Sequence, residues 1–171
     1  GIKPIIGVEA YLASRTLHDK EPGVDEKRYH LTLLAENEEG YHNLIELVTI
    51  SHLEGFYYKP RMDKEILRKY SKGLIALSGC IGGEIPRALF RKDFEEAEKL
   101  VQEYKDIFSK ENFYNETSHH PGIPNHTEIQ KLLRELAQKT RTPLVATQDS
   151  HYLKSEDAQA QDVLLAVQTN T

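Results

Sequence analysis

The sequence contains one cysteine, has no long apolar run and carries no excess of positive charge. One cysteine cannot form an internal disulfide, so Cys80 is a buried apolar residue, a metal thiolate or a nucleophile. No apolar stretch approaches the roughly 20 residues that a membrane helix needs, and residues 1–11 lack the pattern of a signal peptide. These absences predict a cytoplasmic protein with no membrane partner.

The charge balance limits the contacts that the chain can make with nucleic acid. A formal net charge of −5 argues against broad electrostatic binding to a phosphate backbone, which needs clustered lysine and arginine. Any such contact is expected to be local. The 171 residues are 39% apolar and include no low-complexity segment or interdomain linker, which predicts a single domain, 1–171, with a substantial core.

Strand and helix patterns alternate along the chain. Strands are predicted at 5–13, 29–35, 74–80, 113–117 and 143–149, although Asn115 interrupts the fourth of these runs. Helices are predicted at 38–53, opened by Asn37 or Glu38, at 64–70, at 82–91, at 94–108 after Asp93 as N-cap, at 127–140, and at 156–169 after Ser155. This order implies an α/β fold with parallel strands and right-handed crossovers.

Metal-capable side chains are predicted to lie where these strands end. The set comprises Glu9, His30, Cys80, Asp149 and His151. Strands that each deliver a carboxylate, imidazole or thiol describe a site on one rim of an α/β barrel. Asp149 and His151 are two residues apart, so on a strand they point to the same side. Alone, the Asp-Ser-His sequence is a solvated loop after a strand, and the other three residues shift the balance towards a ligand role.

Such a donor set suits phosphoester cleavage. That reaction needs an activated water and neutralised phosphate charge, and clustered divalent ions held by histidine and carboxylate provide both. Imidazole and thiolate favour zinc, whereas carboxylates also admit manganese or magnesium, and Glu9 can bridge two ions. Which ion is used stays open at this point.

Other polar residues carry weaker indications. His18, His42 and His52 are read as surface residues, and the His119, His120 and His126 cluster as loop chemistry around Pro and Gly. The stretch GFYYKPR combines aromatic rings with cations, so Tyr58 and Arg61 are candidates for stacking a base and binding a phosphate. A structural loop over the rim explains this stretch equally well.

Long motifs in this order resemble the polymerase and histidinol phosphatase (PHP) domain, in the branch found in bacterial replicative DNA polymerase III alpha subunits. They are GVEAYLA, YHLTLLAENEEGYHNLIELVTISHLEGFYYKPRMD, GLIALSGCIGGEIPRAL, GIPNH, PLVATQDSHYL and DVLLAVQT. The resemblance implies a distorted (β/α)7 barrel of the TIM-like kind, with a polynuclear metal site at the carboxyl ends of its strands. It also implies that Glu9, His30, Cys80, Asp149 and His151 occupy metal-ligand positions. The cysteine is typical of the polymerase branch, because other members usually carry histidine there.

The chain departs from the family pattern in three ways. The family's opening His-x-His motif is absent and would precede Gly1, FYNET replaces a pattern such as Phe-Tyr-Leu-Glu, and Gln148 replaces the usual asparagine. Five strands are also too few to close an ordinary parallel barrel. We therefore expect a fragment that begins within the domain and has little or no activity by itself.

The resemblance implies two possible functions. One is a metal-dependent phosphoesterase or 3′ to 5′ exonuclease activity. The other is a structural role that supports the polymerase and docks a separate proofreading exonuclease. DNA would then be contacted through the rest of the polymerase, a nucleotidyltransferase of DNA replication. A stand-alone PHP phosphoesterase, such as a histidinol phosphatase, is the main alternative. An interaction module with a vestigial site is the third.

Overall fold

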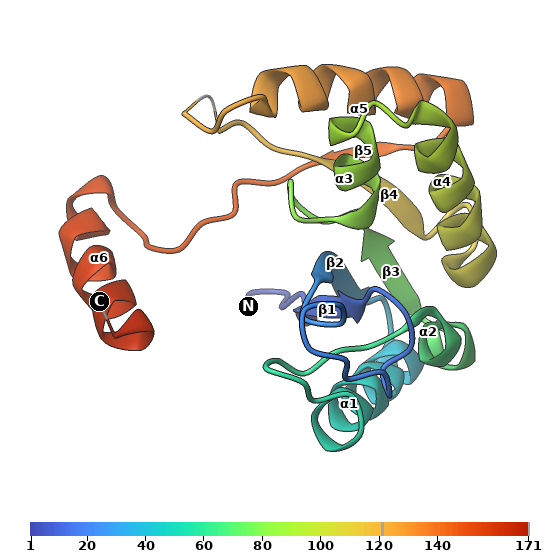
Figure 1. Cartoon of the computed structure of the whole chain (residues 1–171), viewed down its shortest axis with the longest axis horizontal. Coiled ribbons are helices and arrows are strands. Elements are labelled where there is room, and N and C mark those ends of the chain that lie inside the picture. The colour runs from blue at the N-terminus through green and yellow to red at the C-terminus, as the bar shows by residue number, and fades with distance from the viewer. Residues whose placement is uncertain (121, 171) are drawn as a thin grey trace.

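A computed structural model describes residues 1–120 and 122–170 of the chain. Its strands form one five-stranded sheet in the order β1-β2-β3-β4-β5 (Figure 1). The strands are β1 (Gly7–Ala13), β2 (Arg28–Ala35), β3 (Leu74–Leu77), β4 (Phe113–Thr117) and β5 (Leu144–Ala146). The five predicted strands are therefore all present, including the one that contains Asn115. The last is much shorter than predicted and ends before Gln148.

The strand directions differ from the expectation of parallel pairing throughout. β1 pairs antiparallel with β2, and β2 pairs antiparallel with β3, whereas β3, β4 and β5 are parallel neighbours. Residues 14–27 join β1 to β2 without a helix, and a parallel pair needs a crossover connection. Two helices rather than one separate β2 from β3, so this connection is not the single-helix crossover either.

The described residues form six helices in addition to the sheet. They are α1 (Glu38–Leu53), α2 (Lys64–Tyr70), α3 (Glu84–Phe90), α4 (Phe94–Phe108), α5 (His126–Thr140) and α6 (Ala158–Thr169), with a 3-10 turn at Ser155–Asp157. The predicted caps of α1 and α4 are confirmed. The Asn37 side chain accepts from the Gly40 N–H, and the Asp93 side chain accepts from the Glu96 N–H, each at 3.0 Å.

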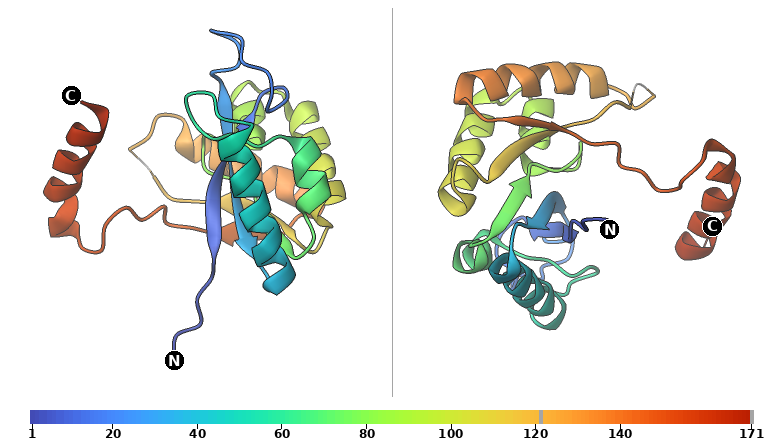
Figure 2. Two further views of the ribbon diagram at one scale, coloured as in Figure 1. Left: turned by 90° about the horizontal axis from the view of Figure 1, so that it is seen from below. Right: turned by 180° about the vertical axis from the view of Figure 1, so that it is seen from behind.

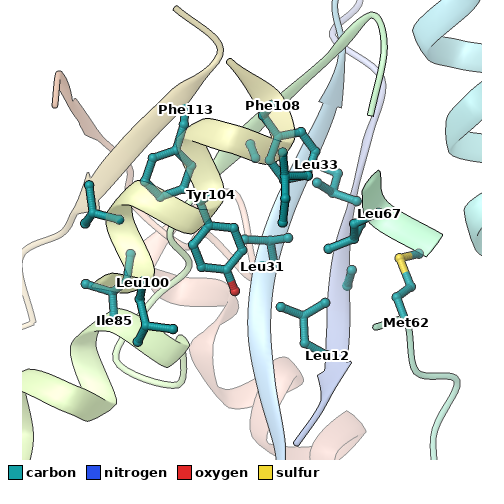
Figure 3. Packing of buried hydrophobic residues seen from close by; sticks show 14 of the residues in the cluster. Leu12, Leu31, Leu33, Met62, Leu67, Ile85, Leu100, Tyr104, Phe108 and Phe113 are labelled. Carbon is teal, nitrogen blue, oxygen red and sulfur yellow. The ribbon is translucent and has the colours of Figure 1, made fainter. Parts of the chain in front are cut away.

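One face of the sheet carries the core, because alternate residues of a strand point to opposite faces. On β2, Leu31 and Leu33 are buried against the helices, together with Leu12 from β1 and Phe113 from β4. Figure 3 shows these residues packed with side chains of α2, α3 and α4, where the Tyr104 ring stacks on Phe113 at 5.2 Å between centroids. Helices α1 to α5 all contribute side chains to this one core cluster and thus cover one face of the sheet.

α6 differs from the other helices because none of its residues is buried. It lies apart from the rest of the described chain (Figures 1 and 2), and its apolar residues are exposed. Val163 and Leu164 are each 61% exposed and Val167 is 75% exposed. Within the described residues, we find no helix with the length and apolar character to cross a membrane.

Candidate metal centre

Three of the predicted ligands meet on the sheet face that the helices leave open. Glu9 lies on β1, His30 lies on β2 beside it, and Cys80 follows the end of β3. His30 Nδ1 lies 2.7 Å from Glu9 Oε1 and 3.4 Å from Cys80 Sγ. One donor atom from each residue lies within 4.8 Å of the other two. A carboxylate, an imidazole and a thiol at such separations suit a divalent cation of the zinc type.

The antiparallel register of β1 and β2 explains why Glu9 and His30 meet. Glu9 is opposite Thr32 and Tyr11 is opposite His30, so the two ligands are diagonal neighbours on one face. The Tyr11 ring meets the imidazole edge to face, with centroids 5.2 Å apart. This contact fixes the plane of the imidazole, whose side chain remains 31% exposed.

Glycines let the loop that carries Cys80 approach His30. Gly79 has a φ of 78°, and a Cβ there would lie 2.5 Å from the His30 carbonyl oxygen. A Cβ on Gly82 would lie 3.2 Å from the imidazole. The His30 N–H donates to the Gly82 carbonyl at 3.1 Å, and the Gly82 N–H approaches Cys80 Sγ at 3.5 Å. The sequence SGCIGG therefore holds the thiol against the imidazole.

The electrostatic environment of Cys80 opposes a free thiolate. Burial raises the pKa of the Cys80 thiol, and the negative charges of Glu9, Asp149 and Glu116 raise it further, against a lowering by the Gly82 N–H. A nucleophilic cysteine needs a lowered pKa and positive neighbours. Acidic neighbours instead favour a cation at this position.

Asp149 and His151 are not part of this three-residue group in the structure. β5 ends at Ala146, so neither residue lies on a strand, and Asp149 has a φ of 51°. The predicted strand through 149, which would direct Asp149 and His151 to one side, is therefore wrong. His151 Nδ1 instead lies 2.8 Å from the Asp149 backbone carbonyl. The negative charge of Asp149 is one of the causes that raise the pKa of the Cys80 thiol. Asp149 and His151 line a separate pocket together with His119 and His120.

Sequence reasoning missed Glu116, the acidic residue of β4. Its carboxylate accepts from the Thr147 hydroxyl at 2.7 Å and the Thr32 hydroxyl at 3.3 Å, and its N–H donates to Ser78 Oγ at 2.9 Å. It thereby links β2, β4 and the segments after β3 and β5 on the open face. The indication was available, because Glu116 is a carboxylate next to the carboxyl end of the predicted strand 113–117.

Tyr58 and Arg61, the candidates for binding a base and a phosphate, lie in different environments. Tyr58 is 62% exposed, but Arg61 is fully buried. The Arg61 guanidinium donates to the backbone carbonyls of Gly55, Asp25, Leu17 and Asp19 at 2.8–3.1 Å. These bonds occupy its donors, so Arg61 is not available to a phosphate. Arginine is rarely buried, and no local sequence pattern indicates that four backbone carbonyls surround this side chain.

His119, His120 and His126 do not belong to the three-residue group. The interpretation of all three as loop residues is wrong for His126, which begins α5. His126 is 2% exposed, its Nε2 lies 3.2 Å from Ser118 Oγ, and its ring packs against that of His120. Burial lowers the pKa of His126, and the neighbouring His120 and His119 lower it further. His126 therefore packs in the structure as a neutral side chain.

Comparison with known proteins defines the class of this fold and site. The PHP domain family model matches residues 1–120, which is more than half of the chain, and the chain belongs to that family. Its mixed sheet with helices on one face agrees with such a domain.

Curated relatives narrow the assignment within the family. The chain is 46% identical to the DNA polymerase III subunit alpha of Thermus aquaticus over 173 residues, which cover 100% of this chain and 14% of that protein. It is 46% identical to the subunit of Borreliella burgdorferi, with 99% and 15% covered, and 42% identical to that of Treponema pallidum, with 99% and 14% covered. The resemblance inferred from the motifs is confirmed. The chain spans about one seventh of the length of these relatives.

Proposed function

We propose that this chain is the PHP portion of a replicative DNA polymerase III alpha subunit. The observation that supports it is identity of 40–46% to such subunits along 98–100% of the chain. The parent protein is then a DNA-directed DNA polymerase that works in the cytoplasm with other replicase subunits, including a proofreading exonuclease. The chain itself contributes part of a distorted (β/α)7 barrel.

The same proposal assigns a divalent metal site to the open face of the sheet. Glu9, His30 and Cys80 would hold the ion, because their donor atoms converge within 4.8 Å. Asp149 and His151 are proposed as further ligands, since the Asp149 charge already acts on Cys80. When bound, the ion supplies Lewis acidity for phosphoester hydrolysis of the 3′ to 5′ exonuclease type. Zinc fits the thiolate best, and manganese or magnesium fits the carboxylates.

The chain's own residues orient this donor set. The Glu9 carboxylate contacts His30 Nδ1 and fixes the ring proton there when no ion is present. Glu116 holds the neighbouring strands through two threonine hydroxyls, and its charge adds to the negative potential on Cys80. The site is thereby suited to attract a cation before any substrate binds.

Metal analysis of the intact protein tests the site. We expect the double variant His30→Ala, Asp149→Ala to lose most of its bound zinc or manganese by mass spectrometry. His42→Ala is the matched control, because His42 is an exposed imidazole on α1 with only a 4.0 Å approach to Glu38. Equal metal content in the wild type and the double variant would overturn the ligand assignment.

Activity assays of the intact protein separate the alternatives. Template-directed incorporation of nucleotides supports the polymerase proposal. Release of phosphate from a small ester such as histidinol phosphate, without nucleotide incorporation, would instead support a stand-alone phosphoesterase. Nucleotide incorporation by a protein that binds no metal at Glu9, His30 and Cys80 would support a purely structural role for this domain.

A further inference from the structure

A cavity lies directly beside the three-residue metal group. It has a volume of about 390 Å³ and is lined by His30, Cys80, Ile81, Gly82, Arg87 and Phe90. One wall is thus made of candidate metal ligands and the other of side chains from α3 and the loop before it. A cavity of this size accommodates a small ligand, since ligand pockets span about 300–1,000 Å³.

Arg87 supplies a positive charge to this cavity that nothing else in the described residues uses. The side chain is exposed, and its guanidinium has no hydrogen bond or ion pair within the described residues. Only the backbone of Arg87 is bonded: its N–H donates to the Gly83 carbonyl and its carbonyl accepts from the Arg91 N–H. The nearby acid of the same helix, Glu84, is committed to Lys64 at 2.9 Å and to the Tyr104 hydroxyl at 2.8 Å. Arg15 and Arg68, by contrast, pair with carboxylates. An unpaired guanidinium beside a cation site is suited to a phosphate, which it binds with two parallel N–H donors.

Phe90 supplies a flat apolar surface to the same cavity. Its side chain is 55% exposed although it is one of the larger apolar residues of the chain, and Ile81 flanks it half-buried. Exposed aromatic rings next to cationic groups are a stacking platform for nucleic-acid bases. A small phosphate ester without a ring would leave this surface unused.

We propose that this cavity binds one nucleotide, with Arg87 on its phosphate and Phe90 stacked on its base. The inference rests on the proposed function, because it places that phosphate against the Glu9, His30 and Cys80 group. Such a site is compatible with a net charge of −5, because the nucleotide is contacted by one guanidinium and one aromatic ring. No broad basic groove is needed.

Binding of deoxythymidine monophosphate to the intact protein tests the proposal without any turnover. We expect Arg87→Gln to raise the Kd for deoxythymidine monophosphate and for inorganic phosphate by roughly tenfold or more, as for loss of one charge-assisted contact. We expect Phe90→Leu to raise the Kd for the nucleotide by about fivefold or more, as for loss of base stacking, and to leave phosphate binding unchanged. Arg134→Gln on α5 is the control, because Arg134 is exposed and does not line the cavity.

Metal content measured on the same samples separates this inference from the metal site. Unchanged metal in Arg87→Gln together with weakened nucleotide binding supports the inference. If Arg87→Gln and Phe90→Leu both bind the nucleotide with wild-type affinity, the nucleotide-binding inference is wrong. This holds even if His30→Ala loses its metal, a result that would leave the proposed metal site in place. Retained metal in His30→Ala overturns the metal site instead. Equal loss of nucleotide and phosphate affinity in Phe90→Leu would refute the base contact.

Discussion

Asp25 is the residue whose charge contributes most clearly to the fold. It is 1% exposed, its carboxylate accepts from Arg15 Nε at 2.9 Å, and it accepts the Glu21 N–H at 2.8 Å. The Arg15 hydrogen bond lowers the pKa of Asp25 from 3.8 to about 2. Because the folded-state pKa lies below the ordinary value, this stabilisation is present above about pH 4 and is lost as the pH falls towards 2.

We therefore expect Asp25→Asn to lower the thermal midpoint of the chain at pH 7 and to have a smaller effect at pH 2.5. Circular dichroism melts at the two pH values measure this. Glu54→Gln, which alters an exposed carboxylate after α1, serves as the control. An equal loss at both pH values would mean that the Asp25 charge is not the cause.

Cys80 allows a second test at the residue scale. A thiolate bound to a cation loses reactivity towards alkylation, so chelation of the intact protein should increase the labelling of Cys80. Because burial raises the pKa of the free thiol, the comparison requires a fixed alkaline pH. Cys80→His should retain metal, since imidazole replaces thiolate at zinc-type positions. Labelling that ignores chelator, with unfolding of Cys80→His, would identify a packing residue.

At the scale of elements, Arg61 connects the loop between β1 and β2 to the segment that follows α1. Its guanidinium joins carbonyls of the β1–β2 loop to Gly55 at the end of α1, and its charge lies 5.2 Å from the Tyr57 ring centroid. We expect Arg61→Ala to destabilise the chain by on the order of 3 kcal/mol, because buried carbonyls lose their partners. Lys59→Ala, an exposed cation in the same segment, should change stability little. Equal denaturation midpoints for the two variants would contradict this role.

The positions of helices and strands were predicted from the sequence better than the directions in which the strands pair. The capping residues Asn37 and Asp93 are local features, and both act as predicted. The antiparallel pairing of β1 and β2 could have been predicted, because no helix pattern lies between them and a parallel pair needs a crossover connection. The direction of β3 could not, because the two helices between β2 and β3 are compatible with either direction. Of the five predicted ligands, the three that adjoin paired strands converge. The two that follow β5 do not, because the strand ends at Ala146.

The burial of polar side chains also depends on contacts that are distant in the sequence. Arg61 was interpreted from its residue type, whereas its environment is set by carbonyls about 40 residues away in sequence. Glu116 was overlooked because the buried Asn115 beside it made the strand look doubtful. Asn115 is in fact fully buried, and its side-chain amide has no partner among the described residues.

At the scale of the whole molecule, the two outer strands of the sheet differ in the described chain. β5 pairs only with β4 and leaves backbone groups of its outer edge unpaired. The outer edge of β1 is partly covered, because the Met62 N–H donates to the Tyr11 carbonyl and the Ala13 N–H donates to the Met62 carbonyl, each at 2.8 Å. Leu144 on β5 is 41% exposed, and the apolar face of α6 is uncovered. Open edges and exposed apolar surface favour association between copies of a chain.

We therefore expect the 171 residues alone to associate in a concentration-dependent way and to show little or no metal-dependent hydrolysis. Sedimentation velocity over a range of concentrations measures the first, and phosphate release with added manganese measures the second. Leu144→Lys should reduce association, because a charge on an outer strand opposes edge pairing. Val24→Lys is the control, since Val24 is 44% exposed in the loop between β1 and β2. A monomer that melts cooperatively and hydrolyses phosphoesters would show that this sheet needs no further strands, which would contradict the barrel proposed for the family.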